Sequence, residues 1–112
     1  MPKFLIEASY SPEGLRGLAK DKASGREAAV KEALSGIGGK LDSIYYALGE
    51  TDVFVVCDCP DHVSAAALGL AVSASGLVRT KTIPLLTIAE VDRALGMHSG
   101  YREPGKAKQA KA

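Results

Sequence analysis

The chain is poor in large aromatic side chains: only 5% of its 112 residues are aromatic, and it has no tryptophan. Leu, Ile, Val and an unusual number of Ala and Gly residues must therefore fill the core, and they bury less area per residue than aromatic rings do. A small single domain with such a core is marginally stable alone, and pairing with a second copy would relieve that. We therefore expect a homodimer or a higher oligomer.

The chain also lacks a charge excess of one sign and a long hydrophobic run. Its formal net charge is +1, and the segment from Ser99 alone carries +3, which leaves −2 for residues 1–98. Such a body offers no basic surface, so we expect no nucleic-acid partner. No long apolar run follows a basic segment near the N-terminus. We therefore expect neither a signal peptide nor a membrane anchor, and a cytoplasmic protein.

Residues 97–112 form a basic segment that contains Gly100, Pro104 and Gly105. This composition is typical of a solvated, disordered tail, while a weak contact with an anion is the alternative. We therefore divide the chain into one domain over residues 1–96 and a tail over residues 97–112.

Only two cysteines are present, Cys57 and Cys59, at alternate positions of one predicted strand. Their side chains share a face with Cα atoms about 6.6 Å apart, the far edge of disulfide reach. A metal site would need two more ligands, and His62 is the only nearby candidate. We expect two reduced, buried thiols and no metal, with His62 and His98 facing solvent. No Gly-x-Ser-x-Gly elbow and no glycine-rich phosphate loop is present, so we predict no cofactor.

The order of predicted elements is the strongest positive signal. Alternating strands and amphipathic helices follow one another as Lys3–Ser9 (strand), a helical stretch to Ile37, Lys40–Leu48 (strand), Val53–Cys59 (strand), a helix from Pro60 to Gly76, Leu77–Leu86 (strand) and a short helix from Thr87 to Gly96. This β-α-β-β-α-β order is the split βαβ arrangement of ferredoxin-like domains. It predicts an α+β fold with a four-stranded antiparallel sheet in the order 4-1-3-2, helices on one face and the other face bare.

Several local patterns refine the helices. The first should start at the Ser11 cap and bend near Asp21 to Gly25, where Ser24 and Glu27 form a second capping box. The second is apolar almost all round, so it is buried on more than one side or belongs to an interface. The last short helix is expected to cover an open sheet edge.

The alternation of side chains along the strands places several charged residues on the bare face. If Phe4, Val55 and Val78 face the helices, the opposite face holds Glu7, Asp58, Arg79 and Lys81. These charges either form an ion-pair lattice between two stacked sheets, which we favour, or bind a polar ligand and move a proton. Tyr45 and Tyr46 are adjacent, so one phenol points to the helices and the other to the bare face. One of the two must be functional or interfacial.

Residues 47–53 and 76–80, read as Ala-Leu-Gly-Glu-Thr-Asp-Val and Gly-Leu-Val-Arg-Thr, resemble the GYD domain family of small bacterial proteins over residues 1–96. Gly49 and Asp52 match the glycine and aspartate of its motif, while Thr51 stands where the family usually has tyrosine. The resemblance implies a dimeric α/β-barrel assembly. It also implies kinship with cofactor-free monooxygenases, isomerases, haem enzymes and ligand-sensing domains. Should the missing phenol have a chemical role, this protein either lacks that role or uses Tyr45 or Tyr46 for it.

These features favour a homo-oligomer that binds a small molecule between sheet and helices or at the dimer barrel. The alternatives are a small enzyme of the barrel class that moves a proton with a tyrosine or the Glu7 group, and an accessory subunit without ligand. Fold alone does not choose among them. Asp52 is expected to be structural, its carboxylate accepting hydrogen bonds from backbone N–H groups of the Gly49 hairpin.

Overall fold

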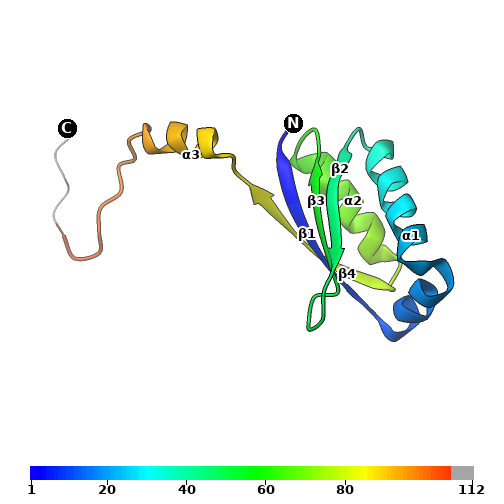
Figure 1. Ribbon diagram of the computed structural model, residues 1–112. Helices are drawn as coiled ribbons and strands as arrows, with labels where there is room; N and C mark the ends of the chain where they lie inside the picture. The colour runs from blue at the N-terminus through cyan, green and yellow to red at the C-terminus, as the bar shows by residue number, and fades with distance from the viewer. Residues whose placement is uncertain (107–112) are drawn as a thin grey trace.

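The computed structural model describes residues 1–106 as a four-stranded sheet with two helices on one face and a third helix set apart (Figure 1). The elements in chain order are β1 (Lys3–Tyr10), α1 (Pro12–Gly36), β2 (Lys40–Tyr46), β3 (Val53–Asp58), α2 (His62–Ala74), β4 (Val78–Leu85) and α3 (Ile88–Leu95). The strand order is β2-β3-β1-β4, which reads 4-1-3-2 from the other edge, and every pairing is antiparallel. The predicted α+β fold with an antiparallel sheet is confirmed.

The core lies between the sheet and the two helices. Alternate residues of the central strands, Phe4, Ile6 and Ala8 of β1 and Val53, Val55 and Cys57 of β3, are buried. Leu34 of α1 and Ala65 of α2 close over them. The strand residues that were predicted to face the helices are therefore the ones that are buried.

Helix α1 starts where its caps predict and is bent in the middle. The Ser11 hydroxyl accepts a hydrogen bond from the Gly14 N–H at 3.0 Å, and Pro12 occupies the first turn, where no N–H is needed. Lys22 leaves the helical conformation with φ 67° and ψ 163°, a left-handed value that is unusual for a residue with a side chain. The predicted kink between Asp21 and Gly25 is thus confirmed.

The first turn of α1 lies tightly against the start of β4. The Ser11 N–H donates to the Leu77 carbonyl oxygen at 2.8 Å, and a methyl group added at Gly14 would lie 2.2 Å from that same oxygen. Real contacts of a Cβ atom are longer, so only glycine fits here without a shift of the backbone.

We expect Gly14→Ala to lower the free energy of unfolding by about 1–3 kcal/mol, the usual cost of overpacking a tight contact. Gly17→Ala is the matched control one turn later, since nothing lies within 4 Å of an added methyl there. Because alanine favours a helix over glycine, the control should gain about 0.5–1 kcal/mol. Urea unfolding of both variants measures the difference. Equal effects would contradict the close approach of α1 to β4.

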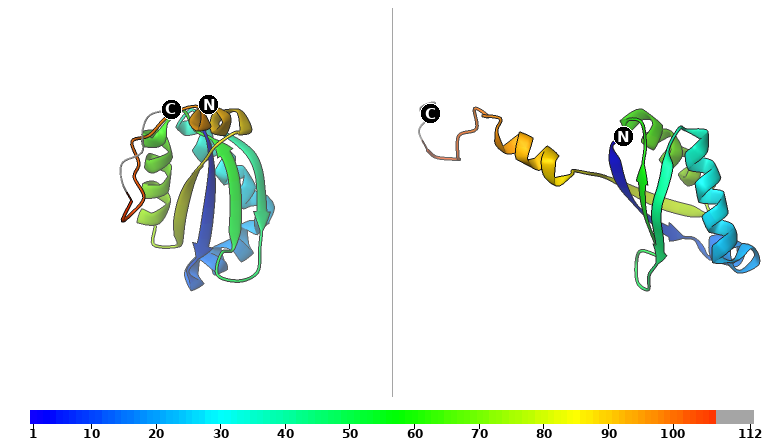
Figure 2. Two further views of the ribbon diagram at one scale, coloured as in Figure 1. Left: turned by 90° about the vertical axis from the view of Figure 1, so that its left-hand side faces the viewer. Right: turned by 45° about the horizontal axis from the view of Figure 1, so that its top comes forward.

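The face of the sheet opposite α1 and α2 is bare, as the left panel of Figure 2 shows by looking onto it. Its centre carries four half-buried residues, Leu5, Phe54, Val56 and Ile83, here called the apolar band. Charged residues lie at both ends of the band: Lys3, Lys40, Asp42 and Asp58 at one end, and Glu7, Arg79 and Lys81 at the other. Within residues 1–106, neither α1 nor α2 packs on this face (Figure 2).

Helix α2 packs on β4 with one side and leaves its other side open. Only Ala65 of this helix is fully buried, while Val63 is 77% and Leu70 is 72% exposed. Burial on more than one side is therefore wrong for the single chain, because these side chains of α2 stay exposed among residues 1–106. The interface alternative stays a prediction.

Helix α3 forms where its capping box predicts, with mutual hydrogen bonds between Thr87 and Glu90. The expectation that it covers a sheet edge is wrong. Strand β4 pairs with the whole of β1, until Leu85 lies opposite Lys3, so the chain leaves the sheet at its end rather than beside an edge. Helix α3 stands beyond that end, away from the other elements (Figure 1).

The segment after α3 was predicted to be a disordered tail. Residues 97–106 contain no helix or strand, and Lys106 pairs with Glu103 at 3.1 Å. The remainder of the predicted tail, residues 107–112, lies outside the described residues. Over residues 1–106, no helix combines the length and the apolar character needed to cross a bilayer.

Candidate ligand-binding site

A cavity of about 110 Å³ lies between the sheet and the two helices, and all four strands and both helices contribute to it. Its walls are almost entirely aliphatic, formed by Ile6, Ala8, Val30, Leu34, Ile44, Val55, Leu68, Val72 and Val78. The cavity is partly open to the surface, and we call the end that carries the part-exposed residues Tyr10, Tyr46 and Arg26 its mouth. For comparison, an engineered apolar cavity of about 150 Å³ holds one benzene molecule. The space therefore suits a small apolar group.

Two tyrosines form the polar mouth of this cavity. Tyr10 ends β1 and Tyr46 ends β2, and their hydroxyl oxygens are 3.2 Å apart, a hydrogen bond that spans the intervening strand β3. Burial raises the pKa of Tyr46, the bond to Tyr10 raises it further, and the nearby Arg26 cation lowers it. Tyr46 therefore stays protonated near neutral pH and offers the mouth a hydroxyl group rather than a phenolate.

Arg26 brings a positive charge to the same wall from the second segment of α1. Its one ion pair within residues 1–106 is with Asp21, across the kink at Lys22, and the Nη1–Oδ2 distance is 3.5 Å. Because Asp21 is half-exposed and the contact is long, this pair contributes little stability. A ligand anion at the cavity mouth could therefore replace Asp21 as the partner of the guanidinium group with little loss of folding stability.

A second hollow of about 280 Å³ adjoins the cavity beneath the first segment of α1. It shares Tyr10, Arg26, Val72 and Val78 with the cavity and is otherwise lined by α1, by Ser75 at the end of α2 and by Leu77. The Tyr10 phenol and the Arg26 guanidinium thus line both the apolar inner space and the outer hollow, while Tyr46 lines the inner space alone. This geometry suits a molecule with one apolar end and one polar or charged end.

The Gly49–Asp52 turn supports the cavity mouth. The Asp52 carboxylate accepts a hydrogen bond from the Tyr10 N–H at 2.8 Å, and the Asp52 N–H donates to the Ala8 carbonyl oxygen at 2.9 Å. The predicted bonds to amides of the hairpin itself are therefore wrong. The turn folds back onto the end of β1, and there the Tyr10 N–H is the donor. Asp52 is structural in the sense that it fixes the strand end that carries Tyr10.

Gly49 and Thr51 of the same turn have separate roles. Gly49 has φ +129°, a value that a residue with a side chain rarely adopts. The Thr51 hydroxyl, which replaces the usual tyrosine of the family motif, donates to Glu7 Oε1 at 3.1 Å. This contact lies on the bare face and not at the cavity.

The charged residues predicted on the bare face lie there but do not form one cluster. Glu7 is directly across from Lys81 and Arg79 is across from Ser9, yet within residues 1–106 neither base makes an ion pair. Asp58 lies at the other end of the face, with its carboxylate 3.0 Å from the Lys3 ammonium group. Whether these charges meet a second sheet stays a prediction.

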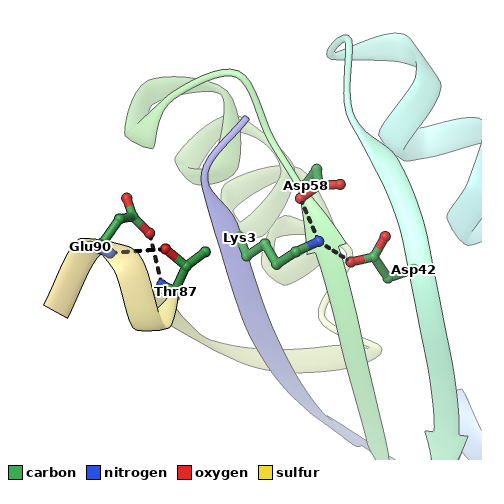
Figure 3. A network of polar contacts seen from close by, with 5 residues as sticks. All are labelled: Lys3, Asp42, Asp58, Thr87 and Glu90. Carbon is green, nitrogen blue, oxygen red and sulfur yellow. Dashed lines mark hydrogen bonds and ion pairs between the residues drawn. The ribbon is translucent and has the colours of Figure 1, made fainter. Parts of the chain in front are cut away.

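Lys3 joins three strands at that end, as Figure 3 shows. Its ammonium group also binds Asp42 of β2, reaching across β3, and these two hydrogen bonds raise the pKa of Lys3. Sequence reasoning missed Lys3, although its place opposite Asp58 follows from the register of β1 and β3. Asp42 lies at an irregular position of β2, where the pairing shifts, and no alternation pattern indicates it.

The two adjacent tyrosines divide as predicted. Tyr46 lies at the cavity, while Tyr45 pairs across from Phe54 on the bare face and is 71% exposed. Sequence reasoning missed Tyr10 and Arg26. Tyr10 follows the buried alternation of Phe4, Ile6 and Ala8, so parity could have found it.

Cys57 and Cys59 are both buried and unbridged, which confirms the prediction of buried thiols. Burial raises the pKa of Cys57 to about 12, so this thiol is neutral and unreactive near neutral pH. His62 is exposed and sets its ring edge-on to Phe4, with ring centroids 5.6 Å apart. Within residues 1–106, no three His, Cys, Asp or Glu side chains gather in a way that would hold a metal ion.

A family model described as GYD domain matches residues 4–95. The chain therefore belongs to the GYD domain family, which confirms the resemblance carried by residues 47–53 and 76–80. No curated protein and no solved structure matches the chain.

Proposed function

We propose that this member of the GYD domain family binds a small organic acid in the cavity between the sheet and the helices. The observation that carries the proposal is an open aliphatic cavity whose mouth holds two phenols and a guanidinium group. Protein interiors are close-packed, so an unfilled space of this size is uncommon unless something enters it. Ligand sites typically combine apolar walls with a few convergent polar groups.

The polar groups indicate the chemistry of the ligand. Arg26 favours an anion, and a carboxylate is the group that a guanidinium binds with two parallel hydrogen bonds. The linked hydroxyl groups of Tyr10 and Tyr46 supply one more donor to the same oxygen atoms. The inner volume of about 110 Å³ suits one ring or a short branched chain. Benzoate joins one ring, for the inner space, to a carboxylate, for the polar mouth, and is therefore a suitable probe.

Binding is favoured over the enzyme alternative. A general base must lose its proton near the working pH, and burial raises the pKa of Tyr46 away from that range. Glu7, the other group considered for proton transfer, lies on the opposite face of the sheet and is held by Thr51. We therefore assign the cavity a binding role.

We also propose that two copies pair through the bare sheet face. The apolar band crosses all but the β2 edge strand, and covering it would remove apolar area from water. A two-fold axis in the plane of contact and perpendicular to the strands would bring the Glu7, Arg79 and Lys81 end of one copy opposite the end of the other that carries Lys3, Lys40, Asp42 and Asp58. Such a self-complementary contact is the usual form of a homodimer interface.

The cavity assignment is tested by titrating benzoate into the full chain by calorimetry. Arg26→Ala should weaken binding about five- to tenfold, as expected for the loss of one half-exposed charge-assisted contact. Arg16→Ala is the matched control, because Arg16 is an exposed residue of α1 that lines neither hollow. Uncharged benzyl alcohol should bind both variants equally. An equal loss in the two variants, or no binding of benzoate to the wild type, would contradict the proposal.

A further inference from the structure

The segment from Leu86 to Met97, here called the C-terminal arm, exposes every large apolar side chain that it carries. Ile88 is 81%, Leu95 is 76% and Met97 is 78% exposed, and Leu86 and Val91 are exposed too. Single exposed apolar residues are ordinary on a protein surface, but a consecutive group of this kind marks an interaction site.

The apolar residues of α3 form one stripe. Ile88, Val91 and Leu95 follow a spacing of three and four residues, which places them on one side of a helix, while Ala89 and Arg93 lie on the opposite side. A helix of 8 residues is unstable alone in water unless something packs on it. The Thr87–Glu90 capping box nevertheless specifies its start. The sequence thus encodes a helix whose apolar stripe is covered by no other element of residues 1–106.

The direction of the arm indicates what covers the stripe. In the left panel of Figure 2, which looks onto the bare face, the arm comes toward the viewer, so it projects on the side of that face. The radius of gyration is 18.5 Å, whereas a compact chain of this length would have roughly 13 Å. A second copy stacked on the bare face would occupy the space into which the arm extends.

The length of the arm fits this arrangement. Two packed sheets lie about 10 Å apart. Two extended residues and the eight residues of α3 together span about 18 Å. Helix α3 would therefore pass beyond the plane of contact and lie alongside the second copy. Two-fold symmetry would make the contact twice, once for each arm.

We propose that the C-terminal arm is a clasp for a second copy of this chain, with the stripe of Ile88, Val91 and Leu95 packed on that copy. The inference rests on the sheet-face pairing proposed above and adds to it a second, separate contact. It gives α3 a partner and explains why its apolar stripe is encoded together with a strong N-terminal cap.

Sedimentation equilibrium of the full chain tests the clasp with the double variant Ile88→Ser/Leu95→Ser. Because both side chains are exposed in the single chain, the domain should keep its thermal unfolding midpoint when studied at concentrations where it is monomeric. The dissociation constant of the dimer should rise at least about tenfold, since each arm loses two apolar anchors. The control is Ala89→Ser/Arg93→Ser on the opposite side of α3, which introduces the same two serines and should leave the constant unchanged.

Three outcomes would overturn the clasp. An unchanged dissociation constant for Ile88→Ser/Leu95→Ser would remove the arm from the interface and leave the sheet-face pairing in place. An equal rise in both double variants would show that helix content, and not the apolar stripe, matters. A wild-type chain that stays monomeric at tens of micromolar would overturn the clasp and the sheet-face pairing together, while benzoate titration would still decide the cavity.

Discussion

A lysine at position 56 is expected to leave the chain folded and to make it monomeric. Val56 lies in the apolar band on β3, across from Leu5, and its side chain faces away from the helices. In the single chain a lysine there would extend into solvent, and the cost to the strand should stay below about 1 kcal/mol. Between two stacked sheets the same ammonium group would be buried without a partner, which is very unfavourable.

We therefore expect Val56→Lys to raise the dissociation constant of the dimer by at least about a hundredfold. Sedimentation velocity over a range of concentrations measures it. Val63→Lys is the control, because it places the same charge on the exposed outer side of α2. A Val56→Lys dimer as tight as the wild type would rule out the bare face as the interface. If Val63→Lys made the dimer dissociate and Val56→Lys did not, the interface would lie on α2 instead.

A leucine at position 8 is expected to abolish benzoate binding without unfolding the protein. Ala8 is buried in β1 and lines the cavity. The larger side chain would fill space that is otherwise open, so it should occupy the place of the ligand's apolar end. Filling a cavity commonly stabilises a protein, and we expect the free energy of unfolding to stay the same or to rise by up to about 1 kcal/mol.

The affinity for benzoate should fall at least about tenfold in Ala8→Leu, as measured by calorimetry alongside thermal unfolding. Ala19→Leu is the control, since Ala19 is exposed on α1 and lines neither hollow. If the space at Ala8 were already closed, leucine would overpack the core and cost about 1–3 kcal/mol. A destabilised Ala8→Leu variant that still binds benzoate would therefore contradict an open cavity at this position.

Much of the fold was predictable because it depends on patterns along the chain. Alternation places Phe4 and Ile6 in the core and Glu7 on the bare face, and it divides Tyr45 from Tyr46 without knowledge of the register. The restart signal of Ser24 and Glu27 predicted the bend that the structure places at Lys22. Caps and strand parity act within a few residues, so one sequence is enough to read them.

The rest depends on contacts between distant segments. The capping box of α3 predicts where the helix starts but not where it lies, so its place beyond the end of β4 was missed. The kink at Lys22 changes which side of α1 faces the sheet, and periodicity therefore did not indicate Arg26. The carboxylate of Asp52 binds Tyr10 rather than its own hairpin because the turn folds back on β1. The cavity itself is a space left between six elements, and no motif encodes it.

The central claim, that the cavity between sheet and helices holds a small acid, is tested most directly by NMR of the isotope-labelled full chain during titration with benzoate. Chemical shifts and contacts between the ligand ring and protein methyl groups would locate the bound molecule. The account predicts contacts with Ile6, Val30 and Leu68, and shift changes at Tyr10 and Arg26 that saturate together. Contacts confined to the apolar band of the bare face, or shifts that never saturate, would contradict it.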